Sequence, residues 1–74
     1  MKRYLVVIEK DAGDNFGAYS PDLPGCVAVG STKEEAEQLM YEAISFHLAG
    51  LKEEGIPLPE NTSTAEYLLL PEAA

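Results

Sequence analysis

The sequence predicts an α+β domain of two layers, in which one amphipathic helix packs on a mainly antiparallel sheet in the order β-β-β-α-β. Three short apolar runs separated by turn-forming residues come first, a long helical pattern follows, and a further apolar run lies near the C-terminus. The 74 residues suffice for one domain, expected over residues 1–74, and leave no room for two.

The first three strands are predicted from apolar runs bounded by turn residues. Residues 4–8 (Tyr-Leu-Val-Val-Ile) end before the turn-rich stretch 11–15, and residues 16–20 supply a second run. Two prolines and a glycine within 21–25 break this pattern, so a third strand is expected over 26–29.

The helix is predicted to begin at Ser31, whose hydroxyl caps the first turn, with Glu34 completing a capping box. Apolar residues then recur at helical spacing and form one stripe wide enough to cover a sheet. Gly55 follows where a left-handed C-terminal cap is expected. The members of the stripe are Ala36, Leu39, Met40, Ala43, Ile44, His47, Leu48 and Leu51.

A fourth strand is predicted over residues 66–70, where Tyr67 and three leucines stand at successive positions before Pro71. A strand that is apolar on both faces is normally covered on both faces, whereas one helix covers only one face of a sheet. The sheet also keeps two edges that can pair with another chain. We therefore expect a homodimer or a larger homo-oligomer.

The charge of the chain indicates which partners suit it. Thirteen acidic and five basic residues give a net charge of −8 and a pI near 4.3. Nucleic-acid binding depends on Lys and Arg that neutralise phosphates, so direct contact with DNA, RNA or an anionic membrane is disfavoured. A basic protein is the complementary partner. The alternative is that the acidity only keeps a small protein soluble.

The same composition indicates the compartment. One cysteine permits no intramolecular disulfide, which fits a reducing, cytoplasmic setting. The apolar run after Lys2 and Arg3 is too short for a signal peptide or a membrane span.

No residue pattern predicts a catalytic, cofactor or metal site. His47 lies on the apolar stripe and is interpreted as a structural residue rather than a base or a ligand. Cys26 opens a predicted strand and is interpreted as a small buried hydrophobe rather than a nucleophile. We therefore expect that the protein is not an enzyme.

Four motifs together resemble the HicB-like antitoxin family. They are residues 21–26 (Pro-Asp-Leu-Pro-Gly-Cys), 30–36 (Gly-Ser-Thr-x-Glu-Glu-Ala), 42–44 (Glu-Ala-Ile) and 55–59 (Gly-Ile-Pro-x-Pro). They follow the family's order and spacing over nearly the whole chain. The resemblance implies the family's N-terminal fold, a partly degraded RNase H-like domain of β-β-β-α-β order.

The resemblance also implies a function. HicB antitoxins bind HicA, a small basic toxin that cleaves mRNA with a histidine, and cover its active site and its RNA-binding surface. An acidic protein that competes with RNA phosphates for a basic face fits this role. Typical members carry a C-terminal DNA-binding domain, but this sequence ends at Ala74 without one. Repression of an operator is therefore not expected.

Two other functions stay open beside this one. The first is a solitary oligomeric HicB-like module that binds a different protein or a small molecule. The second, suggested only by analogy of fold, is a residual metal-dependent nuclease that would use Glu9 and Asp22, two carboxylates near strand ends.

If a partner interface exists, we expect it around the loop after the second strand and the start of the helix. The predicted contact residues are Asp22, Leu23, Glu34, Glu35 and Glu37. The alternative for residues 21–26 is a structural role, in which the motif shapes a tight connection between two strands.

Overall fold

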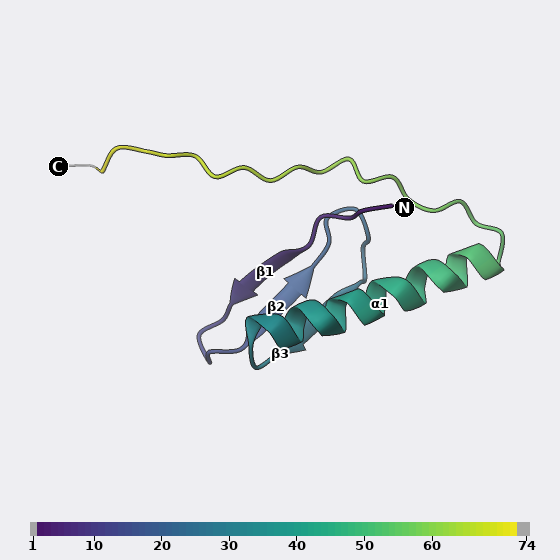
Figure 1. Cartoon of the computed structure of the whole chain (residues 1–74), viewed down its shortest axis with the longest axis horizontal. Coiled ribbons are helices and arrows are strands. Elements are labelled where there is room, and N and C mark those ends of the chain that lie inside the picture. Colours follow the sequence, from purple (N-terminus) through teal and green to yellow (C-terminus); the bar gives the residue numbers. More distant parts are fainter. Residues whose placement is uncertain (1, 73–74) are drawn as a thin grey trace.

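Three short strands form an antiparallel sheet in the computed structural model, which describes residues 2–72. Strand β1 spans Val7–Lys10, β2 spans Phe16–Tyr19 and β3 spans Val27–Gly30, and they lie side by side in that order. Helix α1, Lys33–Glu53, crosses one face of this sheet (Figure 1). The predicted two-layer α+β class, with one helix on an antiparallel sheet, is confirmed.

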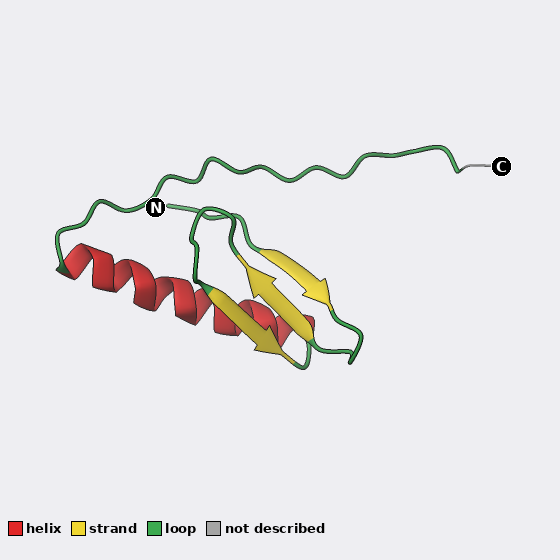
Figure 2. Cartoon of the chain, turned by 180° about the vertical axis from the view of Figure 1, so that it is seen from behind, coloured by secondary structure: helices red, strands yellow, loops and turns green. Residues whose placement is uncertain are grey.

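The register of the strands decides which loops meet at each end of the sheet. Val7, Tyr19 and Val27 stand opposite one another at one end. The β2–β3 loop leaves from that end, whereas the β1–β2 turn and the β3–α1 connection share the other end (Figure 2). Strand β1 begins at Val7, later than predicted, because β2 ends at Tyr19 and leaves residues 4–6 without a strand opposite them.

The helix begins one residue later than the sequence predicted. Thr32, with extended backbone angles, is the N-cap, and its hydroxyl accepts a hydrogen bond from the Glu35 N–H at 3.0 Å. The Glu35 carboxylate in turn accepts the Ser31 N–H at 2.8 Å. Thr32 and Glu35 therefore form a variant of the capping box in which the carboxylate reaches the residue before the N-cap, and the predicted pair of Ser31 and Glu34 was wrong.

The helix ends as predicted. The Gly55 N–H donates to the Lys52 carbonyl at 3.1 Å and the Ile56 N–H donates to the Leu51 carbonyl at 2.9 Å. Gly55 has a φ of 74°, in the left-handed region that favours glycine at this position.

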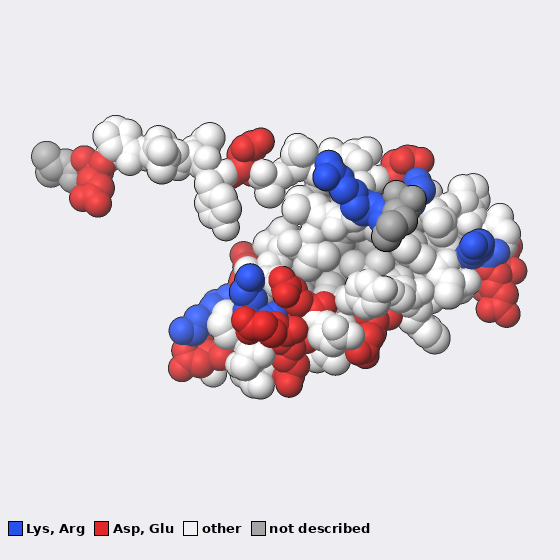
Figure 3. All heavy atoms as spheres, viewed as in Figure 1, with Lys and Arg blue, Asp and Glu red and all other residues white. Residues whose placement is uncertain are grey.

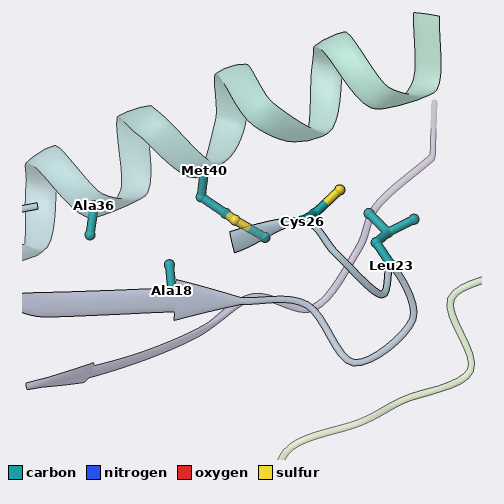
Figure 4. Close-up of a cluster of buried hydrophobic side chains, with 5 residues drawn as sticks. All are labelled: Ala18, Leu23, Cys26, Ala36 and Met40. Carbon is teal, nitrogen blue, oxygen red and sulfur yellow. The ribbon is translucent and has the colours of Figure 1, made fainter. Parts of the chain in front are cut away.

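A thin core lies between α1 and the sheet. Figure 4 shows Met40 pointing from α1 toward the sheet, near Ala18 of β2 and Cys26, the residue just before β3. Ala36 and Leu23 complete the group of fully buried apolar side chains. Most of the predicted helical stripe therefore faces the sheet, but Leu39 is exposed, and only Ala36 and Met40 are fully buried. The opposite face of the sheet remains exposed, with Val27 and Val29 each 65% accessible.

The chain after the helix returns to the N-terminal segment. The Tyr4 hydroxyl donates to the Pro59 carbonyl at 2.6 Å, and the Leu5 N–H donates to Oδ1 of Asn61 at 2.9 Å. An ion pair between Lys2 and Glu60, 3.0 Å long, adds a third contact.

Residues 66–70, the C-terminal arm, then run away from the sheet in an extended conformation (Figures 1 and 2). Within the described part of the chain the arm pairs with no strand, so the predicted fourth strand is not formed. The physical reason lies just before the arm, where the chain turns toward the β2–β3 loop instead of following β1.

Candidate partner-binding surface

Asp22 holds the returning chain against the β2–β3 loop. Its carboxylate accepts four hydrogen bonds from two consecutive residues. Thr62 donates through its N–H and its hydroxyl at 3.0 Å each, and Ser63 through its N–H at 3.0 Å and its hydroxyl at 3.1 Å. Partial burial raises the pKa of the Asp22 carboxyl, but the bonds from Ser63 and Thr62 outweigh it and hold this pKa below its ordinary value.

Leu23, the second predicted contact residue of this loop, belongs to the core. Its side chain is 1% accessible, so a partner cannot touch it in this structure. The loop is closed by bonds from the Leu23 N–H to the Ser20 carbonyl and from the Cys26 N–H to the Leu23 carbonyl. Gly25 has a φ of 90°, a left-handed backbone conformation that favours glycine, so this turn depends on a glycine. These contacts agree with the structural role considered for residues 21–26.

The glutamates of the helix start lie on the surface. Glu34, Glu35 and Glu37 are all exposed, and their position in the first turns of α1 lets the helix dipole stabilise their charges. The Glu35 carboxylate is engaged with Ser31 in the cap, and Glu37 lies 3.9 Å from Lys33.

The structure does not bring the five predicted contact residues together. Asp22 and Leu23 lie at the end of the sheet that carries the β2–β3 loop, while the three glutamates lie at the other end. Strand β3 separates the two groups and covers about 10 Å over its four residues. A single contact surface that includes both groups is therefore not formed.

Asp11 and Asp14 join the helix-start glutamates instead. They stand in the β1–β2 turn, where the Asp11 carboxylate accepts the N–H groups of Gly13 and Asn15 at 2.8 and 3.0 Å. We define the acidic end as Asp11, Asp14, Glu34, Glu35 and Glu37. Figure 3 shows acidic side chains gathered there, at the lower left, with a few basic ones among them. The sequence holds a signal for this grouping, because a three-strand meander places its first turn beside the element that follows the third strand.

Cys26 and His47 line one hollow between β3 and α1. Burial raises the pKa of the Cys26 thiol, which keeps it protonated, and its accessibility of 6% confirms the prediction of a buried small side chain. No hydrogen bond joins these two side chains.

Among residues 2–72, no three His, Cys, Asp or Glu side chains gather as a metal site would require. No helix in the same span is both long and apolar enough to cross a membrane.

A second, more apolar hollow lies on the other side of the helix. This β1–α1 groove has a volume of about 450 Å³ and opens to solvent. One wall comes from residues 4–8 and the other from α1. Its main lining side chains are Tyr4, Val6, Ile8, Met40, Ile44 and Leu48.

Comparison with known proteins gives one consistent family. A family model described as "HicB_like antitoxin of bacterial toxin-antitoxin system" matches residues 4–74. The chain is 39% identical over 69 residues to a 14.9 kDa protein of Haemophilus phage HP1, an alignment that covers 93% of this chain and 51% of the phage protein. The chain thus spans about half the length of that relative.

Two further similarities point the same way. A UPF0150 protein of Synechocystis is 39% identical over 57 residues, which is 77% of this chain and 72% of that protein. Among solved structures, the N-terminal domain of Burkholderia pseudomallei antitoxin HicB superposes with a TM-score of 0.72 at 34% sequence identity. The superposition covers 80% of this chain and 69% of that domain.

Proposed function

The chain belongs to the HicB-like antitoxin family of bacterial toxin-antitoxin systems, and on this premise we propose that it is a non-catalytic antitoxin for a HicA-type toxin. In this proposal the protein binds a small basic toxin that cleaves mRNA and covers the toxin's active site and its RNA-binding surface. The protein would act in the cytoplasm, where mRNA is the toxin's substrate.

The acidic end is the observation that carries the proposal. A surface that displaces RNA from a basic protein must present several negative charges in a fixed arrangement. Hydrogen bonds within the cap and within the β1–β2 turn fix Glu35 and Asp11. Two lysines, Lys10 and Lys33, pair with Asp14 and Glu37 at 3.2 and 3.9 Å. These pairs are exposed and weak, so a basic partner can displace the lysines at little cost.

Of the residues predicted from the sequence, we propose Glu34, Glu35 and Glu37 as direct contacts. Asp22 and Leu23 would support the fold instead, because the first is saturated with hydrogen bonds and the second is buried. The same saturation weighs against the residual nuclease, since both oxygens of Asp22 are already engaged by Thr62 and Ser63.

The test is inhibition of RNA cleavage by a purified HicA-type toxin encoded beside the gene of this chain. We expect equimolar wild-type protein to abolish cleavage at low salt, and the double variant Glu34→Lys/Glu37→Lys to bind the toxin at least tenfold more weakly. The matched control is Glu53→Lys/Glu54→Lys, which makes the same change of charge at the far end of α1 and should inhibit as the wild type does. Cleavage that continues with excess wild-type protein would overturn the proposal.

The second candidate function is a solitary oligomeric module with a different protein or a small-molecule ligand. The exposed C-terminal arm and the β1–α1 groove favour it, because both are apolar surfaces suited to binding and the groove shares only Glu37 with the acidic end. Self-association into a homodimer or a larger oligomer is compatible with either function. We propose it on the same two features.

A further inference from the structure

The C-terminal arm is an extended apolar segment that pairs with no strand among residues 2–72. Tyr67 and Leu69 are fully accessible, and Leu68 and Leu70 are 78% and 79% accessible. The arm projects beyond the body of the molecule (Figures 1 and 2). Successive apolar residues that are exposed in this way are uncommon in monomeric proteins and mark a surface that binds another chain.

The β1–α1 groove is shaped to receive a strand. Tyr4, Val6 and Ile8 stand at alternate positions and so face the same side, which is the geometry of a strand face. Met40, Ile44 and Leu48 follow one another at one-turn spacing along α1 and form the opposite wall. Because the helix lies mostly over β3 and β2, this side of the sheet is left uncovered.

The edge of the sheet beside the groove is also free. Among residues 2–72, strand β1 is the first in the sheet order and pairs only with β2, so the outer backbone groups of Val7–Lys10 can accept another strand. An added strand would extend the sheet with its backbone and would turn every second side chain into the groove.

The lengths of the arm and the groove agree. The wall from Tyr4 to Ile8 extends over about 13 Å in strand geometry, and the wall from Met40 to Leu48 over about 12 Å in helix geometry. The arm, residues 66–70, also covers about 13 Å when extended. Because the arm is apolar at successive positions, one of its faces would fill the groove and the other would extend the apolar surface on the opposite face of the sheet, where Val27 and Val29 are exposed.

The arm is directed away from its own groove. The N–H groups of Thr62 and Ser63 both point to Asp22 in the β2–β3 loop, so this part of the chain cannot donate them to the β1 side. The Leu5 N–H is already bonded to the side chain of Asn61. These bonds prevent the backbone from starting a ladder along β1 where the two segments meet, and the arm leaves the body.

We infer that the arm of one copy adds to the outer edge of β1 in a second copy and fills that copy's β1–α1 groove, with the two copies exchanging arms reciprocally. The exchange rests on the self-association proposed above and is independent of toxin binding. A reciprocal exchange closes the assembly as a dimer, since each copy offers one arm and one groove.

The first test measures the molar mass of the full chain by size-exclusion chromatography with light scattering. We expect a dimer for the wild type and a monomer, with an unchanged circular dichroism spectrum, for Leu68→Ser/Leu69→Ser. The matched control is Phe46→Ser/Ile56→Ser, which removes two other exposed apolar side chains outside the groove and should remain a dimer. A monomeric wild type overturns self-association as a whole, whereas a dimer that survives in the arm variant overturns only the exchange.

The second test identifies whose arm fills the groove. Ser45 is exposed at the groove, so Ser45→Cys and Leu69→Cys can be made on separate chains, mixed and oxidised. We expect a disulfide-linked dimer that contains one chain of each kind, while the wild type, whose Cys26 is buried, gives none. A chain that carries both substitutions and closes a disulfide at monomer mass, without mixed dimers, would show that the arm folds onto its own β1 and overturn the proposal.

Toxin inhibition separates this inference from the proposed function. If the monomeric Leu68→Ser/Leu69→Ser variant still blocks RNA cleavage, the arm serves assembly and the acidic end serves the toxin. A wild-type dimer with exchanged arms that fails to inhibit would leave the exchange intact and refute the antitoxin role.

Discussion

Gly30, the last residue of β3, lies against the backbone of Ala36 in the first turns of α1. A Cβ atom at residue 30 would stand 2.6 Å from the Ala36 nitrogen and 3.0 Å from the carbonyl carbon of Glu35. The backbone of the helix cannot yield to such a contact as a flexible side chain could. The two-layer packing therefore depends on a glycine at the point where the chain passes from the sheet into the helix.

Replacement of this glycine should destabilise the fold. We expect Gly30→Ala to lower the free energy of unfolding by about 1–3 kcal/mol, the usual cost of overpacking. The control is Gly50→Ala, where a Cβ meets nothing within 4 Å and the helix should gain up to about 1 kcal/mol. Urea denaturation followed by circular dichroism measures both. Equal stability of Gly30→Ala and the wild type would contradict this account of the helix start.

The capping box gives a second pair of matched variants. Thr32→Ala removes the hydroxyl that accepts the Glu35 N–H and should cost about 0.5–2 kcal/mol of stability. Ser31→Ala removes only an exposed contact of 3.3 Å to the Glu35 carboxylate and should change stability by less than about 0.5 kcal/mol. Urea midpoints rank the two variants. A larger loss of stability for Ser31→Ala than for Thr32→Ala would identify Ser31 as the N-cap.

Asp22 should make stability depend on pH in the acid range. Because the folded state lowers the pKa of this carboxyl, its contribution is complete above the pKa of the unfolded chain and is lost as pH falls through the lower, folded-state pKa. Asp22→Asn should lower the free energy of unfolding at pH 7 and reduce its further loss at acid pH, whereas Glu53→Gln should leave the pH dependence of stability unchanged. Urea titrations between pH 2 and pH 7 provide the comparison.

Cys26 should react slowly with thiol reagents in the native protein. Burial raises its pKa, so the reactive thiolate is scarce, and the side chain is only 6% accessible. We expect modification by a chromogenic disulfide at pH 8 to be at least 100-fold slower than in 8 M urea. A native rate close to that of the unfolded chain would mean that the core opens at the start of β3.

Much of the fold could be predicted because the patterns were local. The apolar stripe from Ala36 to Leu51 was enough to predict the helix. Gly55 marked its end, because the left-handed backbone conformation there is one that few other residues adopt. The N-cap was displaced by one residue because Ser31 and Thr32 both carry a hydroxyl and both have a glutamate three residues on. Local pattern does not distinguish them, whereas the backbone angles of Thr32 do.

The candidate surface was less predictable because it depends on contacts between distant residues. Asp22 was expected to face a partner, yet its carboxylate is bonded to Thr62 and Ser63, some 40 positions away. Leu23 stands in a loop motif but fills the core. Conversely, Asp11 and Asp14 were left out of the predicted site, although the predicted order of three antiparallel strands already puts their turn at the same end of the sheet as the start of α1.

The order of the strands has a consequence for how quickly the chain reaches this structure. Each strand pairs with its neighbour in sequence and α1 follows at once, so most contacts within the body join residues that are close in sequence, which favours rapid folding. The hydrogen bonds that Thr62 and Ser63 donate to Asp22 close a loop of about 40 residues. Closing this loop costs more entropy than forming the turns between neighbouring strands, so these bonds should form last. The arm would then take its outward direction only after the sheet and the helix have folded. The rate of assembly would therefore be limited by the encounter of two folded chains and not by folding.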